Sequence, residues 1–214
     1  RLAPYHRAGL QVHTHANGDE AVDVLLDGLE QVQLAHPRPD HRHTVQHCQM
    51  TTPGQYRRMQ TLGMCANVFA NHTWFWGDQH RDITVGPDRA ARMNAARTAL
   101  DLGVPLSIHS DSPVTPLGSL HVAWSAVNRL TPSGQVLGAD ERITVAEALH
   151  AITMGAAWQL RMEDEIGSIT TQKFADCAVL EADPFEVAPV ELRDIPIWGT
   201  MSGGVLHEGS PQTT

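Results

Sequence analysis

Positive charge is scarce in this sequence of 214 residues, which has 15 Lys and Arg residues against 24 Asp and Glu and a net charge of −9. Nucleic acids and anionic membrane surfaces bind clusters of positive charge, so a chain without a basic run is not expected to bind either. No apolar stretch approaches the length of a membrane span, and the first ten residues lack the pattern of a signal peptide. We therefore predict a cytoplasmic protein with no nucleic-acid or membrane partner.

Cysteine is also rare, and Cys48, Cys65 and Cys177 are far apart, with no Cys-x-x-Cys pair. This spacing argues against a disulfide framework and predicts reduced thiols. Hydrophobic residues make up 42% of the chain, enough to bury a sizeable core. Initial Met is absent, and residues 1–8 resemble the end of a helix that closes on Gly9, so we expect a piece that starts inside a domain.

Strand and helix patterns alternate along the first three quarters of the chain. A helix after the first strand has apolar residues at three- and four-residue steps, and capping-box patterns begin at Thr52 and Thr144. Alternation of this kind predicts an α/β fold with a parallel sheet. The expected strands are residues 10–15, 42–47, 64–69 and 104–110, and the later helices are residues 88–102, 117–130 and 145–161.

The pattern changes after residue 165. Short extended runs separated by Gly, Pro and Asp predict a small antiparallel sheet, with strands at residues 167–169, 175–180, 195–201 and 205–207. We therefore predict two units, residues 1–162 and residues 163–214.

Three polar residues follow the expected strands at regular intervals. His15 and His47 are 32 residues apart, and Asp111 follows His47 by 64. A (β/α)₈ barrel uses about 250 residues for eight units, so equivalent strand ends are roughly 31 residues apart. The spacing therefore predicts that these residues end three strands of a TIM-type barrel, on the face where barrel enzymes have their active sites.

Two imidazoles and a carboxylate form a ligand set that suits zinc or a similar divalent ion. Such an ion lowers the pKa of water, and Asp111 is the candidate catalytic residue that takes the proton and passes it to a leaving group. The simpler interpretation is that a histidine at a strand end only satisfies its own hydrogen bonds. With 13 histidines, some regular spacing also arises by chance.

Five segments are similar, in order, to the later part of the amidohydrolase superfamily, in the branch that contains N-substituted formamide deformylases. They are HANGDEAVD (15–23), HTVQHCQMT (43–51), IHSDSPVTPLGSL (108–120), ITVAEALHAITMGAA (143–157) and GSITTQKFADCAVLEADPFEV (167–187). The resemblance implies strands five to eight of the (β/α)₈ barrel, followed by part of a small β-sandwich. It also implies hydrolysis of a C–N bond with one or two divalent ions, and His15, His47 and Asp111 as ligands.

In that family a first-strand His-x-His pair and a strand-four lysine complete the metal site. Neither is expected within this sequence, because His13-Thr14-His15 matches strand five and the only lysine is Lys173. The resemblance thus implies a missing N-terminal half of the barrel as partner. A half barrel exposes open sheet edges, so a homo-oligomer is a further expectation.

Residues 71–80 follow the third expected strand and contain aromatic and imidazole side chains. We expect a loop over the site that binds a small amide-type substrate through His72, Trp74, Trp76 and His80, with His72 polarising the carbonyl. The alternative is that Trp74 and Trp76 only pack this loop onto the barrel.

Two classes of function remain open. The first is a hydrolase of amides or formamides, or, within the same class, of cyclic amides or N-acyl amino acids. The second is a truncated, non-catalytic remnant that acts as a binding or assembly module.

Overall fold

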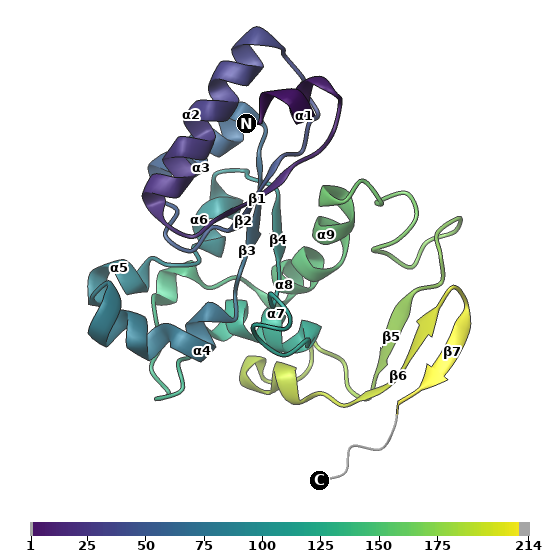
Figure 1. Cartoon of the computed structure of the whole chain (residues 1–214). Coiled ribbons are helices and arrows are strands. Elements are labelled where there is room, and N and C mark those ends of the chain that lie inside the picture. The colour runs from purple at the N-terminus through teal and green to yellow at the C-terminus, as the bar shows by residue number, and fades with distance from the viewer. Residues whose placement is uncertain (1, 210–214) are drawn as a thin grey trace.

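The structure is a computed structural model that describes residues 2–209. Its centre is a sheet of four strands: β1 (His13–Ala16), β2 (Thr44–His47), β3 (Cys65–Val68) and β4 (Leu106–Ile108). All neighbouring strands are parallel, in the order β1-β2-β3-β4 (Figure 1). The α/β fold and the parallel sheet are confirmed. The strands are shorter than predicted; β2, for example, begins only at Thr44 because Arg42 has a left-handed backbone (φ 49°), which an extended strand cannot contain.

The helices near β1 and β2 form as their sequences predict. Helix α2 (Asp19–Ala35) buries Val22, Leu26 and Leu29 on one face. Helix α3 (Pro53–Leu62) has the expected capping box: the Gln55 N–H donates to Thr52 Oγ1 (3.3 Å) and the Thr52 N–H donates to Gln55 Oε1 (2.9 Å). A short helix, α1 (Ala3–Arg7), precedes the sheet, and Figure 1 shows α1 and α2 at the same end of the molecule.

The prediction of one helix over residues 88–102 is wrong. The chain forms two short helices there, α5 (Pro87–Ala91) and α6 (Ala96–Asp101). Asn94 interrupts them with a left-handed backbone (φ 52°). The break exposes main-chain carbonyls, and the buried guanidinium of Arg129 donates to those of Met93 (2.8 Å) and Asn94 (3.0 Å). Tertiary hydrogen bonds thus replace the helical ones.

A second predicted helix, residues 145–161, is also interrupted. It forms α8 (Val145–Ile152) and α9 (Met154–Gln159), with Thr153 non-helical between them. The capping box of Thr144 and Glu147 is confirmed. Helix α7 (Ser119–Asn128) packs against α8 and against a 3₁₀ helix, η3 (Pro189–Asp194); a further 3₁₀ turn, η2, spans Ala139–Glu141.

Residues 72–80 are helical, so the prediction of a loop at residues 71–80 is wrong. Helix α4 (His72–Gln79) continues directly into a π-helical turn, η1 (His80–Thr84).

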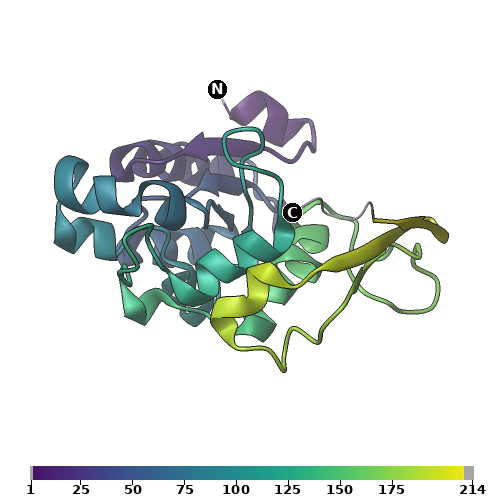
Figure 2. The ribbon, with the colours of Figure 1, turned by 90° about the horizontal axis from the view of Figure 1, so that it is seen from below.

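The C-terminal part contains the predicted antiparallel sheet, with strands β5 (Cys177–Leu180), β6 (Ile197–Ser202) and β7 (Val205–Glu208) in that order. The strand predicted at residues 167–169 is absent there; Gly167 has φ 90°, outside the range of a strand. The small sheet projects from one side of the helix-covered part of the molecule (Figures 1 and 2). Residues 210–214 of the predicted second unit lie outside the described residues.

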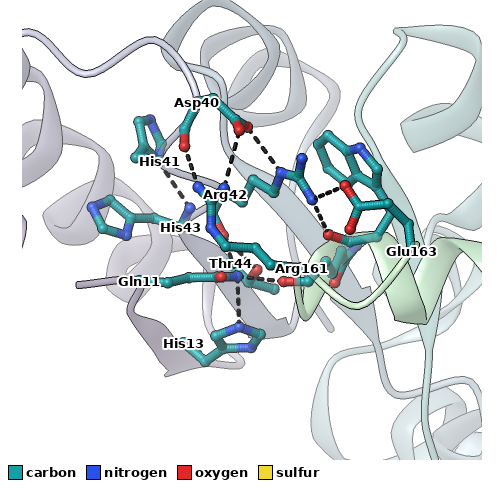
Figure 3. A network of polar contacts seen from close by, with 11 residues as sticks. Gln11, His13, Asp40, His41, Arg42, His43, Thr44, Arg161 and Glu163 are labelled. Carbon is teal, nitrogen blue, oxygen red and sulfur yellow. Dashed lines mark hydrogen bonds and ion pairs between the residues drawn. The ribbon is translucent and has the colours of Figure 1, made fainter. Parts of the chain in front are cut away.

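The segment after α9 is fastened to the chain that enters β2. The Arg42 guanidinium pairs with Asp40 (2.9 Å) and Glu163 (2.7 Å) and lies 4.1 Å from the ring centroid of Trp158. Figure 3 shows this network, in which Arg161 also pairs with Asp40 (3.0 Å). The network therefore links the amino end of β2 to the segment after α9. Within residues 2–209, none of the helices is long and apolar enough to cross a membrane.

Candidate active site

The carboxyl ends of the parallel strands bring the three predicted ligands to one end of the sheet. His15 is the third residue of β1, His47 is the last residue of β2, and Asp111 comes three residues after β4. The ring centroids of His15 and His47 are 4.4 Å apart. In α/β sheets, ligands bind outside the carboxyl ends of the strands, and this is the end of the sheet where the three residues lie.

The tightest group of ligand atoms differs from the predicted set. One ligand-type atom each of His47, His109 and Asp111 lies within 4.8 Å of the other two. His15 is not in this group, although its ring lies beside that of His47, and its side chain is exposed. The structure therefore adds His109 to the residues that the sequence singled out.

Two of these residues have a left-handed backbone, with φ 78° at His47 and φ 54° at Asp111. This conformation is unfavourable for residues other than glycine and is found mostly where the surrounding structure enforces it, often at functional sites. His47 is the last residue of β2 and Asp111 comes three residues after β4, so in both cases this conformation occurs at or just beyond the carboxyl end of a strand.

The turn that contains Asp111 is held by the residues after β3. Asn71 Nδ2 donates to Thr115 Oγ1 (2.9 Å), and the Thr115 hydroxyl donates to the carbonyl oxygen of Ser110. His121 Nδ1 and Ser125 Oγ both donate to Asn71 Oδ1, at 3.2 and 3.3 Å. Buried hydrogen bonds thus position the carboxylate relative to His47.

The electrostatics of this group suit a divalent cation. Burial lowers the pKa of His47, and its Nδ1 is buried without a hydrogen-bond partner among residues 2–209. A neutral imidazole with a free nitrogen is the form that binds metal, and buried polar atoms rarely lack a partner. Together with the Asp111 carboxylate, these atoms fit zinc or a similar ion.

A second cluster extends from the first along α4 and η1. His72, Trp76 and His80 are four residues apart and lie on one helix face, with ring centroids 5.2 Å (His72 to Trp76) and 5.8 Å (His72 to His80) apart. Burial lowers the pKa of His72 to about 3, so this ring is neutral. The Phe69 ring lies between the clusters, 4.3 Å from His72 and 5.2 Å from His109.

Trp74 is not brought together with these residues. It lies on another face of α4, with its ring centroid 5.1 Å from that of Trp124 and 4.6 Å from the Arg193 guanidinium. This placement favours the packing alternative for Trp74, whereas His72, Trp76 and His80 remain together as candidates for substrate binding.

The sheet face below the site is polar. Asn67 Nδ2 donates to Gln46 Oε1 (2.7 Å), and Gln46 Nε2 donates to His13 Nδ1 (2.7 Å). These three residues form a row of hydrogen bonds across β3, β2 and β1. A polar row on the inner strands is typical of a sheet face that borders a site and not of a dry core.

The sequence model described as "Amidohydrolase family" matches residues 2–206. This chain belongs to the amidohydrolase family. It is 31% identical over 204 residues to an N-substituted formamide deformylase from Arthrobacter pascens, which covers 94% of this chain and 37% of that protein. It is also 31% identical over 182 residues to the protein LONG AFTER FAR-RED 3 of Arabidopsis thaliana, covering 84% of this chain and 31% of that one.

Solved structures agree with this family. One is a metal-dependent hydrolase from Pyrococcus horikoshii OT3, described as uncharacterized. The alignment covers 86% of this amidohydrolase chain and 36% of the Pyrococcus chain, with a TM-score of 0.71 and 25% identity. A second from Pyrococcus furiosus covers 77% and 32%, with a TM-score of 0.63 and 27% identity. The chain spans about a third of the length of the curated relatives it matches.

Sequence reasoning about this amidohydrolase chain missed the place of His109 and Phe69. His109 comes two residues before Asp111 in the sequence. A signal was available in both cases. In a strand, the side chains of residues 107 and 109 point to one face of the sheet and that of Ile108 points to the other. The four-residue spacing of His72, Trp76 and His80 indicates a helix directly after Phe69.

Proposed function

We propose that this chain carries the metal-binding residues of an enzyme that hydrolyses the C–N bond of a small amide or formamide. The observation that supports it best is Nδ1 of His47, which lies beside the carboxylate of Asp111 and is buried without a hydrogen-bond partner from residues 2–209. His15, His47 and Asp111 would hold the ion, which we propose to be zinc, with one or two ions in the complete enzyme. When bound, such an ion supplies Lewis acidity and lowers the pKa of water.

Asp111 has the second role, as proton carrier. Its carboxylate makes no ion pair or side-chain hydrogen bond with other residues of the described part, 2–209, so its oxygens are available. It would accept a proton from the attacking water and deliver it to the nitrogen of the leaving amine, which makes that nitrogen a better leaving group.

The substrate would lie against the imidazole and aromatic side chains of α4 and η1. His72 is half-buried and neutral, and its Nδ1 has no hydrogen-bond partner in the described part of the chain, so it can act on a carbonyl group; Trp76 offers an apolar face. His80 is held in place by Gln49 (3.0 Å) and Thr84 (2.8 Å). The relative named N-substituted formamide deformylase supports a formamide as substrate. Cyclic amides and N-acyl amino acids are the alternative within this class.

We further propose that β1 to β4 are strands five to eight of a (β/α)₈ barrel, formed by residues 1–162, and that residues 163–214 form part of a β-sandwich. The N-terminal half of the barrel would then supply the remaining ligands. Support comes from the match to only about a third of the relatives' length, and from β1 and β4 lying at the edges of the described sheet. The cytoplasmic location stays a prediction.

The non-catalytic alternative has one observation in its favour, which is the exposure of His15. If no other segment covers His15, the metal site to which it would belong is incomplete. In that case the chain would act as a binding or assembly module.

Metal content separates the two functions. Zinc should remain bound after dialysis of the 214-residue chain and should be lost from His47→Ala and Asp111→Ala; His207→Ala, on the exposed β7, is the matched control. For Asp111→Asn we expect hydrolysis of N-formyl or N-acyl amines to fall roughly 10²- to 10⁴-fold, the usual contribution of acid–base catalysis. A folded chain that binds no zinc would contradict a metal site formed by this chain alone and would favour the binding module.

Self-association tests the partner proposal. Edge strands of parallel sheets tend to pair with another chain, so we expect the isolated chain to form dimers in sedimentation experiments. Thr14→Lys, which adds charge on the edge strand β1, should weaken the dimer, and Thr61→Lys on α3 should not. A monomer at all concentrations would contradict a homo-oligomer.

A further inference from the structure

His109 lies between the two clusters of the candidate site. Its ring centroid is 5.0 Å from that of His47, and its ring stacks on Phe69 at 5.2 Å with an interplanar angle of 24°. One of its ring nitrogens is within 4.8 Å of one ligand-type atom of His47 and of one carboxylate oxygen of Asp111. By distance alone, His109 would be a third metal ligand.

Its hydrogen bonding argues against that role. The backbone N–H of Asp111 donates to His109 Nδ1 at 3.1 Å. A ring nitrogen that accepts a hydrogen bond carries a lone pair and no hydrogen, so the hydrogen of the neutral imidazole is on Nε2. A protonated Nε2 has no lone pair for a metal, while the lone pair of Nδ1 is already engaged.

The hydrogen-bearing nitrogen of His109 in this neutral form is Nε2. Nε2 is buried and has no hydrogen-bond partner among residues 2–209. Leaving a buried N–H without an acceptor is unfavourable, so it indicates a position where an acceptor from outside the chain is expected.

We propose that His109 is a hydrogen-bond donor to the carbonyl oxygen of the substrate, through Nε2–H, and that it is not a metal ligand. The identity of the acceptor rests on the proposed amide hydrolysis. Negative charge grows on the carbonyl oxygen as water adds to the carbon, and a preorganised N–H stabilises that charge. His109 keeps its proton throughout, and stacking on Phe69 together with the Asp111 N–H fixes the direction in which it donates.

The role as donor or ligand can be tested without turnover. Long-range ¹H–¹⁵N spectra of the metal-free chain should show His109 with hydrogen on Nε2, and titration with zinc should leave that pattern in place while the nitrogens of His47 shift. Zinc content should be retained in His109→Phe and lost in His47→Ala. Hydrogen on Nδ1, or coupling of ¹¹³Cd to a nitrogen of His109, would overturn the proposal.

The acceptor can be tested with formamide as the probe. Saturating formamide should move the Nε2–H resonance of His109 downfield, and an unmoved resonance would overturn the carbonyl contact. In turnover, His109→Phe should lower kcat roughly 10²- to 10³-fold with KM nearly unchanged, as for the loss of one oxyanion donor. His109→Gln keeps an N–H and should recover part of kcat.

Failure of the proposed function would be visible separately. If no variant binds zinc but the Nε2 tautomer and the formamide shift are present, the metal chemistry is wrong while His109 remains a carbonyl donor. If zinc binds through His47 and Asp111 but turnover is equal in His109→Phe and wild type, the hydrolase stands and the role of His109 is wrong.

Discussion

The side chains of α4 show how closely spaced residues on one helix serve different purposes. His72 and Trp76 face the candidate site, whereas Trp74 contacts Trp124 and Arg193 on the opposite side. A helix places residues four apart on one face and residues two apart on different faces. The sequence shows which residue types this segment contains. Its interpretation as a loop does not show which of those side chains point to the candidate site.

The two tryptophans should therefore respond differently to truncation. Trp74→Leu removes an aromatic contact and a cation–π contact, so we expect it to lower the free energy of unfolding by about 2 kcal/mol in urea titrations. Its kcat/KM per folded molecule should be unchanged. Trp76→Leu should instead raise KM with a smaller loss of stability. A raised KM for Trp74→Leu at wild-type stability would restore Trp74 to the substrate site.

At the scale of elements, local patterns predicted where helices begin better than where they break. The capping boxes at Thr52 and Thr144 formed as expected, because they depend on residues three apart. The breaks at Asn94 and Thr153 depend on distant partners. Arg129 supports the first, and the second lets α9 approach β4 so closely that a Cβ on Gly155 would lie 2.4 Å from the carbonyl oxygen of Leu106.

Gly155→Ala tests this close approach. Because the neighbouring atom is main chain and cannot move aside, we expect a loss of about 1–3 kcal/mol in the free energy of unfolding, the range for overpacking. Gly28→Ala in α2 is the matched control: no atom lies within 4 Å of its added methyl group, so helix propensity should stabilise the chain by about 0.5–1 kcal/mol. Equal effects of the two changes in urea denaturation would contradict the tight α9–β4 contact.

At the scale of the whole molecule, a buried histidine network joins α1, the end of α2 and the chain before β2. His6 Nε2 donates to the His36 carbonyl (2.8 Å), His43 Nε2 donates to His6 Nδ1 (2.9 Å), and the Val12 N–H donates to His43 Nδ1 (3.1 Å). His41, labelled with His43 in Figure 3, accepts from the His43 N–H (2.9 Å). The rings of His41 and His43 are neutral in this arrangement, because their Nδ1 atoms accept backbone N–H groups and a proton there would place two donors face to face.

This network makes stability depend on pH. Burial lowers the pKa of His41, and lowers that of His43 to about 3, whereas an unfolded histidine titrates near 6.5. The unfolded chain therefore binds more protons, so the stabilisation is present above about pH 6.5 and is lost as the pH falls from there toward 3. For His43 the expected loss between pH 7 and pH 5 is about 2 kcal/mol.

Urea denaturation at the two pH values measures that loss. In His43→Gln the decrease in unfolding free energy should be smaller than in wild type by about 2 kcal/mol. His207→Gln, at an exposed position, should show the wild-type decrease. An unchanged decrease in His43→Gln would contradict a neutral, buried His43.

By itself, the sequence determined the α/β class, the two capped helices, the antiparallel C-terminal strands and the strand ends where His15, His47 and Asp111 lie. All of these depend on residues that are close in the chain or on regular spacing. Only the tertiary structure decided where the helices break and that residues 72–84 are helical. It also decided that Trp74 packs on another face of α4 and that His109 lies beside His47. Those features depend on hydrogen bonds and packing between segments distant in the sequence, which no local pattern records.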